Sequence, residues 1–135
     1  MSLQIGDTCQ YEFSVSNEDM ASFARMSDDS SDVHTSSAFA TDLGYKDVIV
    51  YGGIILAKLS HVLGMKIPGP KGVSMSWQID YREPLYVDEQ ATILLKVVDV
   101  SQATGVVSAK FKVTSEKRLI ASGKTQSFLS SAKVG

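Results

Sequence analysis

The sequence predicts an α+β protein in which a curved antiparallel sheet wraps around one buried helix. Residues 54–63 are apolar around most of a helix circumference, and residues 75–128 have the composition and alternation of consecutive β-strands. A buried helix beside a long antiparallel sheet makes two layers around one core. The chain of 135 residues is long enough for one domain, which we expect to span residues 1–135.

Helices are expected in the first half of the chain. Ser16 followed by Asp19 matches a capping box, and apolar residues at helical spacing follow it. Residues 36–44 are expected to form one or two further helical turns that end at Gly44. The segment "YGGIILAKLSHVLG", residues 51–64, predicts a helix that is buried on most sides.

The second half is expected to form a meander of strands. "MSWQIDYR", residues 75–82, alternates between apolar and polar side chains, as a half-buried strand does. The turn "EPLYVDEQ" follows, and then three β-branched runs separated by "QATG" and "EK". Short links predict that each strand pairs with the next one. Residues 130–135 are expected to fray.

Composition excludes several classes of function. The net charge is −2, and no run of Lys or Arg is present, so nucleic acid is not an expected partner. No apolar run reaches the length of about 18 residues that a membrane span needs, and no signal peptide is recognisable at the N-terminus. Cys9 is the one cysteine and can form no internal disulfide, which favours a reducing cytoplasm.

An acidic segment follows the first expected helix, "FARMSDDSSDVH", residues 23–34. It does not fit a calcium loop, which needs a glycine at its sixth position and a glutamate at its twelfth, and it has too few ligands for zinc. We therefore expect no metal. One interpretation is a solvated loop in which Asp32 or Ser30 caps the next helix. The other pairs Asp29 with His34 as an acid/base pair that adds or removes water across a double bond.

Gly52 and Gly53 open the expected buried helix. Backbone N–H groups at a helix N-terminus have no intrahelical partner, and glycine leaves them accessible. Such groups can stabilise negative charge on a carbonyl oxygen during a reaction. The competing interpretation is that the two glycines permit close backbone packing.

These residues together resemble a known family. "FARMSDDSSDVHTSSAFATDLGYKDVIVYGGIILAKLS" is similar to the hydratase 2 segment of MaoC-like, (R)-specific enoyl-CoA hydratases, and the similarity continues through "VLGMKIPGPKG" and "PLYVDEQAT". The resemblance implies a hotdog fold and a homodimer. It also implies syn hydration of a trans-2-enoyl thioester to an (R)-3-hydroxyacyl thioester, or the reverse dehydration.

The resemblance assigns roles to individual residues. Asp29 and His34 match the catalytic pair that activates water and exchanges the proton at the α-carbon. Gly52 matches the glycine whose N–H binds the thioester oxygen, with Gly53 beside it. Ser60 matches a serine near the active site in some members, although a hydroxyl satisfied within its own helix explains it equally well.

The chain departs from the family pattern at three places. Ser31 and Asp32 stand where the family usually has Asn-Pro, Tyr51 stands where it usually has His, and Asp28 replaces a small residue. Ser31 and Tyr51 are expected to join the substrate-binding shell. Loss of the proline is expected to loosen the loop, and the neighbouring carboxylates are expected to raise the pKa of Asp29.

The expected function is therefore that of a hydro-lyase acting on an enoyl or 3-hydroxyacyl thioester. No metal or redox cofactor is expected, because CoA or the phosphopantetheine of an acyl carrier protein is part of the substrate. Two alternatives remain. One is a hotdog thioesterase, and the other is a catalytically weak hotdog protein that binds acyl thioesters.

Overall fold

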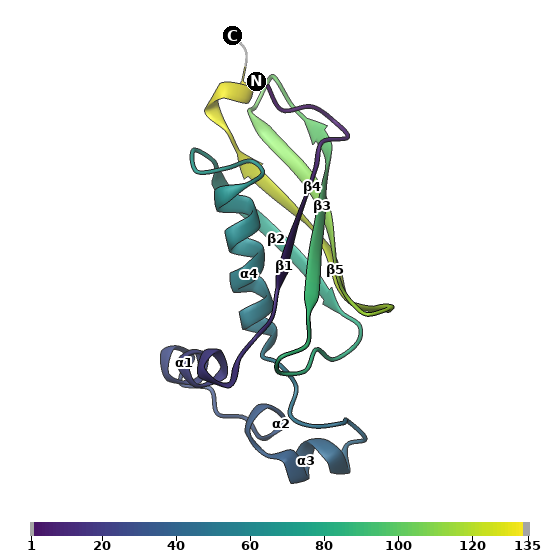
Figure 1. Ribbon diagram of the computed structural model, residues 1–135. Coiled ribbons are helices and arrows are strands. Elements are labelled where there is room, and N and C mark those ends of the chain that lie inside the picture. The colour runs from purple at the N-terminus through teal and green to yellow at the C-terminus, as the bar shows by residue number, and fades with distance from the viewer. Residues whose placement is uncertain (1, 134–135) are drawn as a thin grey trace.

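One five-stranded antiparallel sheet organises the protein, in the order β1-β3-β4-β5-β2 (Figure 1). The computed structural model describes residues 2–133. The strands are β1 (Thr8–Phe13), β2 (Val73–Tyr81), β3 (Ala91–Val100), β4 (Val106–Ser115) and β5 (Arg118–Phe128). The helices are α1 (Asn17–Ser27), α2 (Asp32–Thr35), α3 (Ser37–Asp42) and α4 (Gly52–Met65), followed at the end of the chain by the 3-10 turn η1 (Ser130–Ala132).

The core lies between α4 and one face of the sheet, while α1, α2 and α3 gather at the end where α4 begins (Figure 1). Alternate residues of β3 and β4 point into this core because successive side chains of a strand face opposite sides. The helix contributes Ile54, Ile55, Leu59, Val62 and Leu63. The predicted α+β arrangement of a sheet with one central helix is confirmed.

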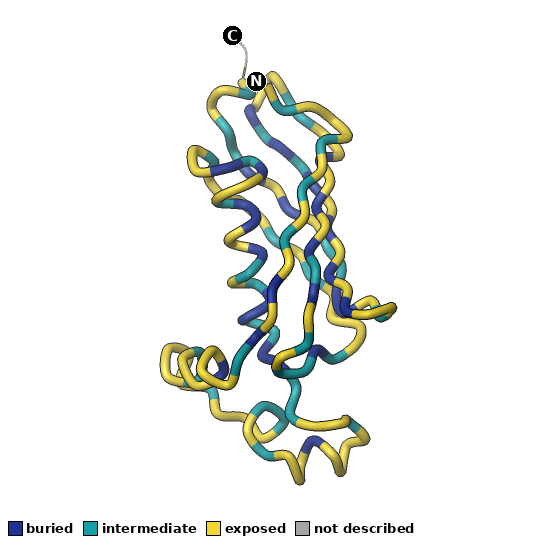
Figure 2. Tube along the Cα trace, in the orientation of Figure 1, coloured by how far each residue is buried: buried dark blue, intermediate teal, exposed yellow. Residues whose placement is uncertain are grey.

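The helix α4 is buried on one side only, so the prediction of a helix buried on most sides was wrong. Ala57, Ser60 and His61 are exposed along one face, and Met65 at the end of the helix is 64% exposed. Figure 2 shows the alternation of buried and exposed positions along this helix. The sheet covers one face of α4, and α1 packs against its first turn through Phe23, whereas Ala57, Ser60 and His61 further along stay exposed.

The predicted meander is correct for the last three of its four strands and wrong for the first, β2. β3, β4 and β5 pair in sequence, but β2 pairs with β5 and lies at the edge of the sheet. Alternation within a strand identifies its two faces and carries no information about its partner. β1 was not predicted at all, because "TCQYEF" is short and largely polar.

The ends of the helices follow the expected local chemistry, with one exception. Ser16 Oγ accepts a hydrogen bond from the Asp19 amide at 3.1 Å, and Asp19 Oδ2 accepts one from the Ser16 amide at 2.9 Å, which confirms the capping box. α3 ends just before Gly44, whose φ of +95° favours glycine. The cap of α2 is Ser31, so neither Asp32 nor Ser30 holds that place.

At the C-terminus, η1 orders residues that were expected to fray, and residues 134–135 of that prediction lie outside the described part. Within residues 2–133, no helix combines the length and hydropathy that crossing a membrane requires. The same residues contain no group of three or more His, Cys, Asp and Glu side chains placed to hold a metal ion.

Two glycines of α4 differ in their surroundings and provide a matched test of packing. A Cβ at Gly53 would lie 2.3 Å from Cζ of Phe23, whereas a Cβ at Gly64 would meet nothing within 4 Å. Gly53→Ala is expected to lower the free energy of unfolding by about 1 to 3 kcal/mol because the Phe23 ring must move. Gly64→Ala is expected to raise it by up to about 1 kcal/mol through helix propensity alone. Urea denaturation of both variants measures this, and equal effects would contradict the close contact at Gly53.

Candidate active site

The loop after α1 fixes Asp29 in its ionised form. Asp28 ends α1 in the left-handed conformation, with a φ of +57°, and turns the chain toward Asp29. Oδ1 of Asp29 accepts a hydrogen bond from the Ser31 amide at 2.9 Å and another from the Ser31 hydroxyl. These hydrogen bonds hold the pKa of Asp29 below its usual value, the hydroxyl contributing most. The expectation that neighbouring carboxylates raise this pKa was wrong, because direct hydrogen bonds outweigh diffuse repulsion at an open loop.

The imidazole of His34 is oriented by the backbone that precedes α4. Nδ1 of His34 lies 2.8 Å from the carbonyl oxygen of Ile49. A carbonyl oxygen only accepts hydrogen bonds, so Nδ1 must carry the proton in this contact. In the neutral ring, Nε2 then holds the lone pair and is the atom able to accept a proton.

Tyr51 contacts both predicted catalytic residues, Asp29 through a hydrogen bond and His34 through ring stacking. Its side chain is 2% exposed, its hydroxyl donates to the backbone carbonyl of Asp29 at 2.7 Å, and its ring stacks on that of His34 with centroids 4.1 Å apart. The ring of Phe23 packs against the same tyrosine at 4.7 Å. Tyr51 therefore holds the Asp29 loop and the imidazole against the start of α4, and its place among the substrate-binding residues stays a prediction.

Gly52 is the first residue of α4 and presents its amide at the positive end of a 14-residue helix. The Tyr81 hydroxyl donates to the carbonyl of Gly52 at 2.8 Å, and a Cβ at Gly52 would lie 2.7 Å from Tyr81 ring atoms. Close packing thus explains the absence of a side chain at both glycines, against Tyr81 here and against Phe23 at Gly53. The Gly52 carbonyl is engaged, which leaves its N–H as the group available to a ligand.

A pocket of about 430 Å³ brings His34 and Gly52 together. Its lining is drawn from five parts of the chain, namely α2, the loop before α4, α4 itself, the end of β2 and the turn after it: His34, Tyr45, Ile49, Val50, Gly52, Ile55, Tyr81, Arg82, Glu83, Pro84 and Leu85. Asp29, Ser31 and Tyr51 lie outside this lining. Tyr51 stacks on His34 and donates to the Asp29 carbonyl, and the His34 amide donates to the Ser31 carbonyl at 3.0 Å. Ser60 is exposed two turns along α4, and no contact of the described residues links it to the pocket.

The sequence interpretation missed one wall of this pocket, residues 81–85. Tyr81 is half exposed and contributes its ring, and burial raises the pKa of its hydroxyl. Arg82 and Glu83 add opposite charges beside it. The available signal was the proline turn directly after the alternating strand, because a strand end beside a sharp turn often lies at the edge of a site.

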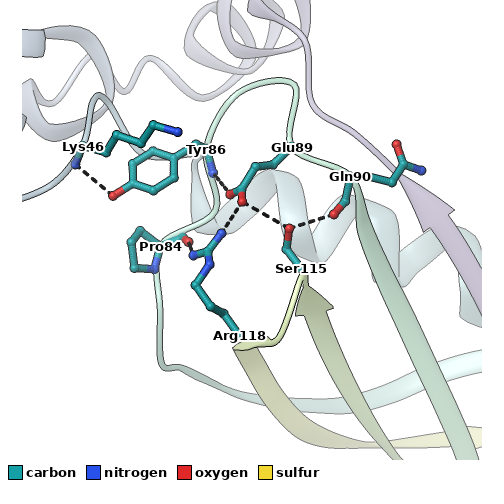
Figure 3. Close-up of polar contacts among 7 residues, drawn as sticks. All are labelled: Lys46, Pro84, Tyr86, Glu89, Gln90, Ser115 and Arg118. Atoms are coloured by element: carbon teal, nitrogen blue, oxygen red, sulfur yellow. Dashed lines mark hydrogen bonds and ion pairs between the residues drawn. The ribbon is translucent and has the colours of Figure 1, made fainter.

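A polar network holds this wall in place (Figure 3). Arg118 donates to the carbonyl of Pro84 at 2.6 Å and forms an ion pair with Glu89. Glu89 also accepts from the Tyr86 amide at 2.9 Å. Burial raises the pKa of Glu89, but the hydrogen bonds from Arg118 and from Tyr86 outweigh it and leave that pKa below its usual value.

The network reaches the imidazole through the backbone. The Tyr86 hydroxyl accepts from the Lys46 amide at 3.0 Å, and Tyr86 forms a β-bridge with Ile49, whose carbonyl holds His34. The next amide, that of Val50, donates to Leu85 at 2.8 Å. Two loops that are distant in sequence are thus joined at the pocket. The loop after β2 forms one wall of the pocket, and the loop before α4 carries the Ile49 carbonyl that orients His34.

Curated relatives share most of the chain. An (R)-specific enoyl-CoA hydratase of Aeromonas caviae is 25% identical over 96 residues, which is 71% of this chain and 72% of the relative. A 3-hydroxybutyryl-CoA dehydratase of Methylorubrum extorquens is 26% identical over 98 residues, covering 73% and 62%. A mitochondrial 3-hydroxyacyl-[acyl-carrier-protein] dehydratase of Arabidopsis thaliana is 23% identical over 109 residues, covering 81% and 64%. No family model matches the chain.

Solved structures agree on the architecture. The (R)-hydratase from A. caviae involved in PHA biosynthesis superposes with a TM-score of 0.89 at 21% identity, covering 95% of this chain and 98% of that one. The chain is a hotdog-fold homologue of these hydratases. A MaoC-like dehydratase superposes with a TM-score of 0.81 at 14% identity, covering 95% of this chain and 41% of that one. The predicted resemblance and the hotdog fold are confirmed, and the relatives with named activities are hydratases and dehydratases, as predicted.

Proposed function

We propose that this hotdog homologue interconverts a trans-2-enoyl thioester and an (R)-3-hydroxyacyl thioester by adding or removing water. The observation that carries the proposal is the meeting of a backbone-oriented imidazole and the first amide of α4 in one pocket. Hydration of an enoyl thioester needs both features, a proton carrier beside the double bond and a donor for the carbonyl oxygen. The named relatives support the same reaction class.

The roles follow from the protonation states. The Asp29 carboxylate, kept ionised by Ser31, holds the attacking water by accepting one of its hydrogens. Nε2 of His34 takes a proton from that water as its oxygen bonds to the β-carbon. The same proton passes to the α-carbon on the same face, so that the elements of one water molecule add to the double bond. The Gly52 N–H stabilises the enolate-like charge that develops on the thioester oxygen.

The substrate carrier is part of the proposal. The relatives include enzymes named for CoA substrates and enzymes named for acyl carrier protein substrates. Both carriers present the acyl group through a phosphopantetheine thioester, and the proposed chemistry acts on that shared part. The residues assigned to the reaction require no metal or redox group.

The direct test is the loss of enoyl-thioester absorbance with crotonyl-CoA and with longer trans-2-enoyl-CoAs, followed by the chirality of the product. We expect the (R)-3-hydroxyacyl thioester to form without release of free thiol. Free thiol would indicate the thioesterase alternative. Tight binding without turnover of CoA-linked or carrier-linked substrates would favour the acyl-binding alternative.

We also propose that two copies associate through β2. This edge strand carries exposed apolar side chains, with Val73 60%, Met75 57% and Tyr81 50% exposed, and it has one unpaired edge. An unpaired apolar edge favours pairing with another strand, and a twofold axis would pair β2 with its copy. The exposed face of α4, which carries Ala57 and Met65 beside Ser60 and His61, is a second surface open to such a partner. Sedimentation equilibrium should then give twice the mass of the chain, and a monomer at micromolar concentration would contradict the proposal.

We also propose that the protein acts in the cytoplasm. Cys9 is half buried, and burial raises the pKa of its thiol, which keeps it protonated and unreactive. A single protonated thiol suits a reducing environment, so we place the reaction in the cytoplasm. Labelling the cell fractions with an antibody to the protein tests this placement.

A further inference from the structure

Four lysines gather on the face of the sheet that α4 does not cover. Lys96 on β3 pairs directly with Lys110 on β4, and Lys110 pairs in turn with Lys124 on β5. Lys112 lies two residues from Lys110 and points to the same side, because alternate residues of a strand share a face. These four residues, called the lysine face below, are all exposed.

Folding alone does not account for this arrangement. Like charges directly opposite each other on neighbouring strands destabilise a sheet, and here the repulsion extends over three strands. The row ends in neutral residues, Thr8 on β1 and Gln78 on β2, so no carboxylate lies in register with it. Neither ion pair found among residues 2–133 involves the lysine face. In the neighbouring row, Lys112 pairs with Ser122, which pairs with Asp80; this carboxylate lines the same pocket and lies 4.0 Å from Arg82.

The lysine face is hollowed and partly apolar. A pocket of about 610 Å³ lies over it, and Phe111 and Gly123 are part of its lining. Leu94 and Val98, which are 45% and 38% exposed, border the same pocket. The surface therefore offers cationic groups spaced about 4.8 Å apart across the strands, with apolar contacts beside them.

This spacing and composition suit one class of partner. Side chains at positions i, i+3 and i+4 of a helix lie about 5 to 6 Å apart, which matches the row of lysines. We infer that the lysine face docks an acidic amphipathic helix of a partner protein, with carboxylates on the lysines and apolar side chains on Leu94 and Val98. The inference is independent of the thioester reaction, because the lysine face lies on the opposite side of the sheet from α4.

Other polyanions fit less well. A nucleic acid site usually combines a long basic surface with aromatic side chains for stacking, and the lining of this pocket contains one aromatic residue, Phe111, which is buried. The whole chain carries a net charge of −2, which repels a polyanion that extends beyond the lysine face. A short acidic helix confines its charge to the area that the lysines cover.

The test uses a fluorescein-labelled synthetic helix with glutamates on one face and leucines on the other, and measures anisotropy against the full chain. We expect saturable binding that weakens as salt rises, because exposed ion pairs are screened. The triple variant Lys96→Gln/Lys110→Gln/Lys124→Gln should lower the affinity about tenfold or more. The control Lys66→Gln/Lys71→Gln/Lys117→Gln removes the same charge from exposed positions elsewhere and should change it less than about twofold.

A second variant separates loss of binding from loss of fold. Lys110→Glu places a negative charge between two lysines, so Tm should rise by about 2 to 4 °C while binding of the helix falls. Absence of saturable binding would overturn the inference, as would equal losses in the test and control triples. Tighter binding of single-stranded DNA, inorganic tripolyphosphate or anionic phosphatidylserine vesicles than of the helix would overturn it too, in favour of that other ligand.

Discussion

Replacing His34 with alanine should lower kcat for hydration of crotonyl-CoA by about 10²- to 10⁴-fold. The variant loses the nitrogen that carries the proton from water to the α-carbon, whereas the Gly52 N–H and the pocket remain. KM should change far less than kcat, because the imidazole acts on the reaction and contributes little to binding of the carrier. Initial rates of absorbance loss over a range of substrate concentrations separate the two constants.

Two further variants define what the loss means. Asp29→Asn keeps an oxygen that accepts from Ser31 but removes the charge that orients water, so kcat should fall by about 10²-fold or more. The matched control is His61→Ala, which removes the other histidine, an exposed side chain of α4 that packs on Tyr11. Its kcat should stay within about twofold of the original value. Near-normal turnover by His34→Ala would exclude this residue from the mechanism.

Arg118→Leu should lower the free energy of unfolding by about 2 to 3 kcal/mol at pH 7. The substitution leaves Glu89 in a partly buried site without its cation and removes the hydrogen bond to the carbonyl of Pro84. The side chains of the pair are 30% and 17% exposed, so solvent reduces the loss below that of a fully buried pair. Urea denaturation followed by circular dichroism measures the difference.

The effect of pH on this difference has a defined sign. The pKa of Glu89 is lowered by folding, so its contribution to stability is present above the unfolded pKa and is lost as pH falls through the lower folded pKa. The gap between the original protein and Arg118→Leu should therefore narrow at low pH. Arg82→Leu is the control, since Arg82 is exposed and its ion pair is long, and it should cost less than about 0.5 kcal/mol. A gap that widens on acidification would contradict this account.

Local chemistry explains which parts of the fold were predictable. The capping box at Ser16 and the bounds of α4 depend on neighbouring residues, and the structure confirms both. The position of β2 beside β5 and the existence of β1 depend on pairing between distant segments, which alternation along one strand does not encode. The exposed face of α4 likewise depends on what covers it, and the apolar composition of the helix alone suggested burial on most sides.

The candidate site divides in the same way. Asp29, His34 and Gly52 were found because they lie in one motif, and their catalytic roles stay predictions. The direction of the pKa shift at Asp29 was missed because a charge count does not reveal the two hydrogen bonds from Ser31. Tyr81 and the turn after it lie at least 29 residues beyond Gly52, and only the folded backbone brings them to the pocket.

The hydrogen bond from His34 to the Ile49 carbonyl also bears on how damaging substitutions should be distributed along the chain. Which nitrogen of the imidazole is reactive depends on a peptide group, and that peptide group is held through Tyr86 by the loop that Arg118 anchors. A mutational screen for activity should therefore find sensitive positions in residues 84–89 and at Arg118, far from the acidic motif in sequence. Substitutions there should change the orientation of the His34 ring and lower kcat even though every residue of the motif is unchanged.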